Sequence, residues 1–366
     1  MIDEAINLNL AKIKKTIFGK YMNMIMAESQ DAKGAYTLVR NLQKRFADKL
    51  DVISATLGES KNFEEVLWLR DEGLHGGGSR FQARDFSLFN TASINVSQVH
   101  YDEIPQKNLK SATAISTIIH PKNPHVPSIH IHISLTELRN APAYWRVMAD
   151  LNPSILNKDD KNSFDNALKE LAGGTYKEGK LQGEKYFDIP ALERKRGVSH
   201  FYLENYKTTD KKQDLELAKN FGEGIIDKYI EIITAAFTSR TKISQADIQE
   251  QLKYHTLYLF QVLTLDRGTT SGLLIHNQND VGIMGSLPSH VDKKLLLSWA
   301  KKVPSPQEYL ILSLGECLND DGIVNDDVKI KLANVVRKHY KTYPEALSMQ
   351  ASGNTVPSTV DNHTKD

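Results

Sequence analysis

The clearest pattern of apolar and polar positions in this chain is a strict alternation between residues 129 and 134. Isoleucine occupies the three odd positions, and the even positions hold His130, His132 and Ser134. Because side chains of a β-strand point alternately to its two faces, this stretch predicts a strand with the isoleucines in a core and both imidazoles opposite. Two imidazoles on one face are typical of a pocket wall or a metal site. A half-exposed strand whose histidines meet water is the simpler alternative.

Apolar residues elsewhere recur with helical or strand spacing. Spacing of three and four residues predicts helices in segments 2–50, 159–171, 215–237 and 290–342. Short β-rich runs predict strands at 93–100, 116–120, 129–134, 196–203, 257–266 and 272–276, the last two joined by a turn at 267–269. Since strands cluster between helical runs, the sequence predicts an α+β fold with one large, mainly antiparallel sheet.

Composition narrows the functional classes. The 366 residues include 46 basic and 45 acidic side chains, and a net charge of +1 gives no footprint for nucleic acid or an anionic membrane. The single cysteine, Cys317, lies in an apolar helical run and excludes an internal disulfide or an iron–sulfur cluster. The N-terminus lacks a basic region before an apolar stretch, and no run approaches the roughly eighteen apolar residues of a membrane span. We therefore expect a cytoplasmic protein without a membrane span.

Five short blocks give the chain a family resemblance. They are His-Pro-Lys-Asn-Pro-His-Val-Pro-Ser-Ile-His at 120–130, a Tyr-Trp segment ending in Asp-Leu-Asn-Pro at 150–153, Trp-Leu-Arg-Asp-Glu-Gly at 68–73 with glycines at 76–78, Asp-Arg-Gly-Thr at 266–269 with Gly-Leu at 272–273, and Ser-Leu-Pro at 286–288. In this order, over roughly residues 60 to 315, they resemble oxygen-dependent coproporphyrinogen III oxidase.

The resemblance implies a fold, an assembly and a reaction. The fold is a large sheet sandwiched between helices, and the assembly is a homodimer. The reaction converts two propionate side chains of coproporphyrinogen III to vinyl groups in porphyrin and haem biosynthesis, with dioxygen as co-substrate and no organic cofactor. With the helical pattern, the resemblance divides the chain into a helical N-terminal segment (1–50), an oxidase-like domain (51–317), a helical extension (318–347) and a disordered tail (348–366).

The reaction asks for particular side chains. A carboxylate must accept the pyrrole N–H groups, cations must bind the propionates, and the pocket must exclude bulk water. The resemblance assigns Asp150 to the macrocycle and His130 to proton donation. It assigns to the substrate the positions of Ser116, His120, His132, Ser134, Arg196 and Arg267.

Three of these charged residues also have purely structural interpretations. Asp150 precedes an Asn-Pro pair, which is a common turn setting. Arg196 ends the basic run 194–196, and such runs are usually solvated surface. Arg267 has an adjacent carboxylate, Asp266, with which it could form a structural ion pair.

The chain also departs from the family pattern. After the histidine at position 130 the family has Asn-x-Arg, whose arginine contacts substrate, but this chain has His132 and Ser134. Family glycines are replaced at 147–149 and at 199–200, and a Gly-Gly-Arg of the family falls at 276–278. Because glycine permits close approach to a ligand, these changes should reshape the pocket. A divergent paralogue acting on another substrate, or a silent porphyrin-binding module, is therefore an alternative to the oxidase.

No metal is expected. Two histidines proposed as metal ligands in some bacterial members of the family fall at Asp165 and Ala191. A different alternative keeps a metal: His130 and His132 with Asp150 or Glu137 could form a two-histidine-one-carboxylate iron site of an oxygenase.

Overall fold

The computed structural model describes residues 24–58, 62–84, 87–275 and 279–353. Three parts of the sequence-based predictions lie outside these residues: residues 2–23 of the predicted helix at 2–50, the Gly-Gly-Arg position at 276–278 and the tail from residue 354.

One antiparallel sheet of seven strands forms the centre of the fold. Its order is β1-β2-β3-β4-β5-β6-β9, so chain neighbours pair except where β9 follows β6. The strands are β1 (Glu64–Leu69), β2 (Gly76–Arg84), β3 (Phe89–His100), β4 (Leu109–Pro121), β5 (Ser128–Leu138), β6 (Tyr144–Asn152) and β9 (Ser199–Tyr206). A separate pair consists of β7 (Asp188–Ile189) and β8 (Arg194–Lys195). The predicted α+β class and antiparallel sheet are confirmed.

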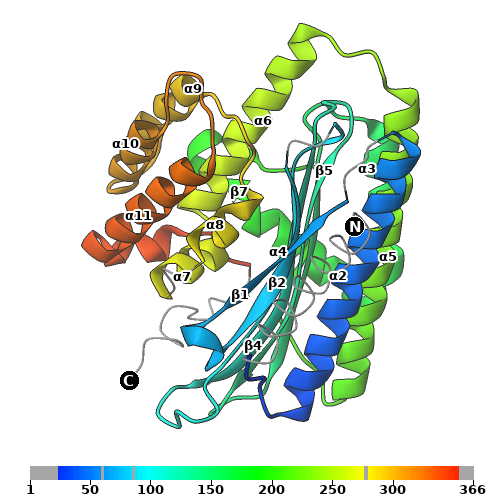
Figure 1. Cartoon of the computed structure of the whole chain (residues 1–366), viewed down its shortest axis with the longest axis vertical. Coiled ribbons are helices and arrows are strands. Elements are labelled where there is room, and N and C mark those ends of the chain that lie inside the picture. The colour runs from blue at the N-terminus through cyan, green and yellow to red at the C-terminus, as the bar shows by residue number, and fades with distance from the viewer. Residues whose placement is uncertain (1–23, 59–61, 85–86, 276–278, 354–366) are drawn as a thin grey trace, which may run out of the picture.

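Helices cover both faces of this sheet (Figure 1). One layer contains α2 (Gln30–Thr56), α3 (Lys158–Ala172) and α5 (Lys211–Ser239). On the other side lie α6 (Gln245–Thr264), α7 (Arg267–Ile275), α8 (Asp280–Ile283), α9 (Lys293–Ser298), α10 (Gln307–Cys317) and α11 (Asp326–Thr342). Helix α4 (Tyr176–Tyr186) packs on β9. Within the described chain, every helix is too short or too polar to cross a membrane.

Short 3₁₀ segments connect several of these elements. They are η1 (Asp71–Gly73), η2 (Gly173–Thr175), η3 (Pro190–Leu192), η4 (Met284–Ser286), η5 (Ala300–Lys302) and η6 (Pro344–Met349). Segment η4 contacts β3 and β4, and it thereby brings the second helical layer onto the sheet.

The two helical layers enclose separate cores. The isoleucines at 129, 131 and 133 are at most 1% exposed and pack with α2, α3 and α5 in the larger core. The second core joins α6, α7 and α9–α11, and Ile118 of β4 reaches it from the opposite sheet face. The alternation predicted for β5 is confirmed, because its isoleucines face the first core.

Two predicted strands are wrong. Residues 257–266 belong mainly to α6, and residues 272–275 end α7. Every side chain from Tyr254 to Thr264 is buried, so this half of α6 has no polar stripe to reveal its helical period. The helices predicted at 159–171 and 215–237 are confirmed, whereas the predicted helix at 290–342 is divided into α9, η5, α10 and α11.

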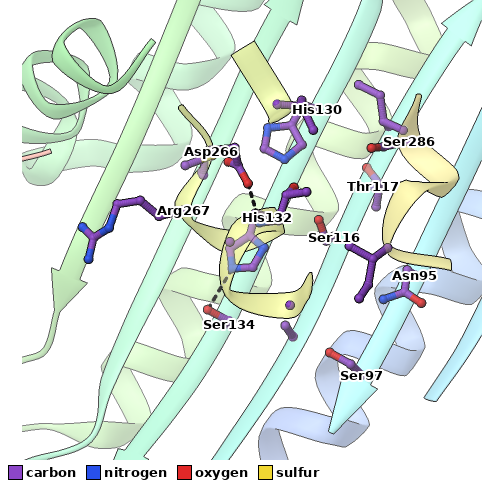
Figure 2. Close-up of a pocket in the computed structure, with 18 of the residues that line it drawn as sticks. Asn95, Ser97, Ser116, Thr117, His130, His132, Ser134, Asp266, Arg267 and Ser286 are labelled. Carbon is purple, nitrogen blue, oxygen red and sulfur yellow. Dashed lines mark hydrogen bonds between the residues drawn. The ribbon is translucent and has the colours of Figure 1, made fainter. Parts of the chain in front are cut away.

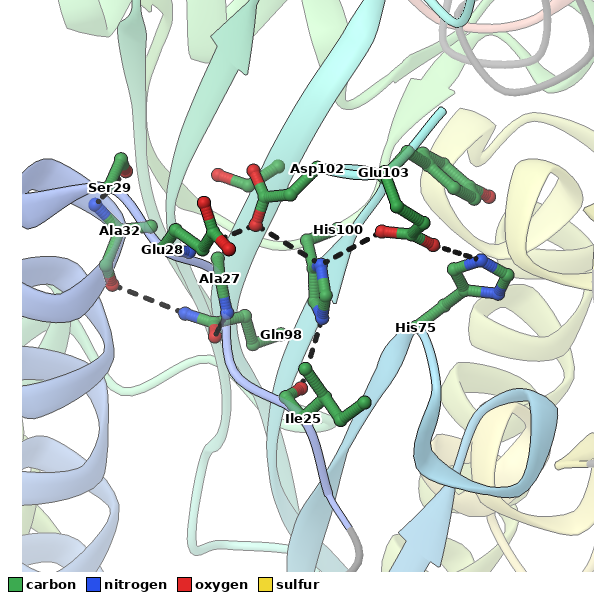
Figure 3. Close-up of polar contacts among 12 residues, drawn as sticks. Ile25, Ala27, Glu28, Ser29, Ala32, His75, Gln98, His100, Asp102 and Glu103 are labelled. Carbon is green, nitrogen blue, oxygen red and sulfur yellow. Dashed lines mark hydrogen bonds and ion pairs between the residues drawn. The ribbon is translucent and has the colours of Figure 1, made fainter. Parts of the chain in front are cut away.

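The segment before α2 is fastened to the end of β3 (Figure 3). The amide of Ala27 donates to Gln98 Oε1 and the amide of Glu28 donates to Asp102 Oδ2, each at 2.9 Å. His100 Nε2 donates to the carbonyl of Ile25 at 3.0 Å. Helix α2 begins only after Ser29, whose side chain caps it, and continues to Thr56, beyond the predicted end at residue 50.

Candidate active site

A cavity of about 340 Å³ lies between the sheet and the second helical layer (Figure 2). Its sheet wall follows the pleat, since alternate side chains from each central strand reach it. These are Ser93, Asn95, Ser97 and Val99 on β3, Ala112, Ala114, Ser116 and Ile118 on β4, and His130, His132, Ser134 and Thr136 on β5. Most of these side chains on β3 and β4 are serine or alanine. Because such side chains are small, this part of the cavity wall is nearly flat and suits a flat ligand.

At one end of this wall, His130 is hydrogen-bonded to a buried pair of opposite charges, Asp150 and Arg196. Strand pairing sets it directly opposite Asp150 on β6. The Nδ1–H of His130 donates to Asp150 Oδ1 at 2.7 Å, and Arg196 Nη2 donates to Asp150 Oδ2 at 2.7 Å. Asn152 adds a third bond to this carboxylate at 2.6 Å. The imidazole is thus held in one orientation, and its Nε2 remains for the cavity.

The environment of Asp150 keeps it ionised. Burial of the carboxyl raises its pKa, but the Arg196 guanidinium and His130 outweigh burial and bring the pKa to about 2. Asp150 has no exposed surface, and it is absent from the cavity lining. Its oxygens accept from three side chains, and two of these bonds fix the orientations of His130 and Arg196.

Arg196 is an internal residue, although the basic run at 194–196 is typical of solvated surface. Its neighbours Arg194 and Lys195 on β8 are exposed, whereas Arg196 is 2% exposed. Its Nη1 donates to Gln261 Oε1 at 2.7 Å. The guanidinium also lies 4.6 Å from the ring centre of Phe187 and 5.0 Å from that of Tyr258, in cation–π contact.

The low pKa of Asp150 gives a testable pH dependence. Because the pKa of Asp150 is lower in the folded state than in the unfolded state, its ionised carboxylate stabilises the fold. This contribution is complete above the unfolded-state pKa of about 4 and is lost as the pH falls toward the folded-state pKa of about 2. We expect the stability difference between wild type and Asp150→Asn to narrow by about 2 kcal/mol between pH 5 and pH 2. Urea unfolding of both proteins across this range measures it. A difference independent of pH would contradict the charged pair.

The other predicted residues divide between the cavity and the interior. Ser116, His132 and Ser134 line the cavity, and His132 Nε2 lies 3.0 Å from Ser134 Oγ. Burial lowers the pKa of His132 to about 3, so this imidazole is neutral. His120 is fully buried outside the lining, where its Nδ1 accepts from Ser128 at 3.0 Å.

The Asp266–Arg267 pair supplies both signs of charge to the cavity wall. Arg267 Nη1 lies 3.6 Å from Glu204 Oε1 on β9. Asp266 Oδ1 accepts the amide of Thr269 at 2.7 Å at the start of α7, and its Oδ2 accepts the Tyr186 hydroxyl at 2.9 Å. Both Asp266 and Arg267 line the cavity. The carboxylates that face it are therefore Glu204 and Asp266, within the part of the chain that the structure describes.

Several lining residues were missed in the sequence. They include Trp68, Asn95, Tyr186, Glu204 and Asp266. Arg146 also lines the cavity; with Arg139, it is one of two nearby arginines that could compensate for Ser134. Arg146 and Glu204 follow the same alternation that revealed His130, but their strands β6 and β9 have apolar residues on both faces, which hides the period. Tyr186 comes from α4, and only the tertiary fold brings it here.

The residues suggested for an iron site do not converge. Glu137 faces the opposite side of β5, where Ser29 and Ser111 each donate to its Oε2 at 2.6 Å. Across the described ranges, no three histidine, cysteine or acidic side chains are placed to hold a metal ion.

Comparison with known proteins identifies the family. Residues 35–315 match the family described as coproporphyrinogen III oxidase, which is more than half of the chain. The chain belongs to this family. The match includes the whole sheet and every lining residue of the cavity.

Similarity to individual members of the family is low. The chain is 27% identical over 256 residues to human mitochondrial oxygen-dependent coproporphyrinogen-III oxidase, a match that covers 62% of this chain and 55% of the human protein. It is 26% identical over 296 residues to the Prochlorococcus marinus strain AS9601 oxygen-dependent coproporphyrinogen-III oxidase, which covers 70% of this chain and 84% of that protein. The chain thus spans about half the length of the human relative.

Proposed function

We propose that this chain catalyses the oxygen-dependent oxidative decarboxylation of coproporphyrinogen III propionates to vinyl groups. The observation that carries the proposal is the cavity-facing His130 on its buried Asp150–Arg196 pair, within residues that match the family. The names of the similar proteins point to the same reaction.

The proposed chemistry balances without a further reactant. Each propionic acid side chain and one dioxygen give a vinyl group, carbon dioxide and hydrogen peroxide, so the substrate loses two electrons and dioxygen gains them. We assign proton transfer at the reacting centre to Nε2 of His130, because Asp150 holds Nδ1. Residues of the helical layer, such as Tyr258 and Asp266, form one wall of the cavity and restrict the access of bulk water to the reacting propionate.

The test is aerobic incubation of the purified chain with coproporphyrinogen III. We expect protoporphyrin fluorescence, after chemical oxidation of the product, to increase with time and with enzyme. Dioxygen removal should stop the increase. Absence of product at enzyme concentrations near that of the substrate would contradict the proposal.

The same assay tests the proposed independence from metals. Turnover should persist after dialysis against a chelator, because dioxygen is the proposed electron acceptor. The histidine and acidic side chains of the cavity also have other partners: His130 pairs with Asp150, His132 contacts Ser134, Asp266 accepts from Tyr186, and Glu204 lies near Arg267. Stoichiometric iron in the purified protein, with activity lost on chelation, would instead favour the oxygenase alternative.

One observation favours a second candidate function. Ser134 lines the cavity at the position where the family resemblance implies a substrate-binding arginine, and serine lacks the fork of donors that arginine offers a carboxylate. A divergent paralogue for another tetrapyrrole, or a silent porphyrin-binding module, would bind porphyrins without forming protoporphyrin in the assay.

We also propose a homodimer, which the family resemblance supports, and a cytoplasmic location, which the use of one unpaired cysteine supports.

A further inference from the structure

We propose that Arg146 binds a substrate carboxylate. It would replace the arginine that the family resemblance implies on β5 at position 134, where this chain has a serine. The inference rests on the proposed function for the identity of the substrate, although the binding of a carboxylate porphyrin can be measured without turnover. It adds a specificity-determining residue to the cavity.

Strand pairing places Arg146 beside Ser134. Ser134 on β5 and Arg146 on β6 are direct partners in the antiparallel register, and both line the cavity. The Cβ atoms of such partners lie about 5 Å apart. The side chain of arginine is longer than this separation, so a guanidinium on β6 can serve a ligand group that an arginine on β5 would have bound.

Arg146 also has unused binding capacity. Its hydrogen bond is to the hydroxyl of Tyr144, at 3.1 Å, and it forms no ion pair with a carboxylate of the described chain. The two other arginines that line the described cavity differ, because Arg196 is paired with Asp150 and Arg267 lies near Glu204. Burial lowers the pKa of Arg146, but nearby Tyr202, Tyr144 and Glu204 outweigh burial and keep the guanidinium charged. Glu204 itself is paired with Arg267, so a ligand carboxylate would be the direct anionic partner of the half-buried Arg146.

Arg139, the other arginine close to Ser134 in the sequence, forms its hydrogen bonds elsewhere. Arg139 donates from Nε to the carbonyl of Lys107 at 2.9 Å and from Nη2 to the carbonyl of Ile104 at 3.2 Å. These bonds hold the end of β5 to the loop before β4, and Arg139 does not line the cavity. His132 is neutral and provides no cation either.

The test uses coproporphyrin III, the oxidised tetracarboxylate, whose binding to the whole chain is followed by its fluorescence. We expect Arg146→Gln to weaken binding at least 30-fold, as for removal of one partner of a desolvated charged pair. Binding of the tetramethyl ester, which has no charged carboxylate, should not change. Arg45→Gln is the matched control, because Arg45 pairs with Asp227 on the far face of the sheet. Equal binding of coproporphyrin III by wild type and Arg146→Gln would overturn the inference.

An exchange of the two side chains separates this inference from the proposed function. Ser134→Arg combined with Arg146→Ser should recover at least 10-fold of the affinity that Arg146→Ser alone loses, since the charge returns to the same part of the cavity. If coproporphyrin III binding depends on Arg146 but wild type forms no protoporphyrin, the proposed function fails and the inference stands. If wild type turns over and Arg146→Gln leaves KM unchanged, the inference fails and the proposed function stands.

Discussion

Replacement of Asp150 by alanine is expected to lower the turnover of coproporphyrinogen III about a thousandfold or more and to destabilise the fold by about 3–5 kcal/mol. The fold loses stability because Arg196, at 2% exposure, would be left as a buried cation without its anion. Turnover falls because His130 loses the acceptor that fixes its Nδ1. Steady-state kinetics and urea unfolding of the same preparation measure both effects.

A matched variant separates the two losses. Asp160→Ala removes a carboxylate that pairs with both terminal nitrogens of Arg240, at 2.6 and 2.7 Å, outside the cavity. We expect it to reduce stability and to leave the kcat of the folded protein unchanged. Near-full turnover in Asp150→Ala would show that the carboxylate does not support the reaction.

The second large effect is expected at His130. His130→Ala should lower kcat by about 10²–10⁴-fold, the usual contribution of a general acid or base. Stability should change little, because the imidazole faces the cavity and water can replace its bond to Asp150, which keeps Arg196 and Asn152 as donors. Single-turnover kinetics at saturating substrate measure the loss in the chemical step.

The control for His130 is another histidine paired with a carboxylate. His125→Ala removes the partner of Asp247, 3.2 Å away, at a position outside the cavity. It should keep wild-type kcat. If His130→Ala lowered the melting temperature as strongly as Asp150→Ala while kcat per folded molecule stayed the same, His130 would be a structural residue.

The sequence was most informative where one face of an element is apolar and the other polar. Strand β5 meets this condition, so the placement of His130, His132 and Ser134 on one face could be predicted. The amphipathic helices α3 and α5 meet it too. The C-terminal half of α6 does not, since it is buried all round, and its β-branched and aromatic residues then favoured a strand.

The partners of the site residues were harder to predict than the residues. Arg196 and Asp150 are 46 positions apart in the chain, and their contact depends on how β9 and the segment before it return to β6. The spacing of apolar and polar residues within one segment gives no information on which distant strand that segment will pair with. The family resemblance assigned Asp150 to the macrocycle; in the fold its carboxylate is fully buried and accepts from His130, Arg196 and Asn152. The pairing of Ser134 with Arg146 requires the strand register, which no periodicity reveals.

The alternation along β5 has a consequence for how this protein can evolve. Residues that hold the fold and residues that meet the ligand occupy opposite faces of the same strand, so most substitutions on the ligand face leave the isoleucine core untouched. Such a strand tolerates drift in specificity at little cost in folding. Asp150, on the neighbouring strand β6, is different, because its burial and its pairing with Arg196 tie it to the stability of the fold as well as to the cavity.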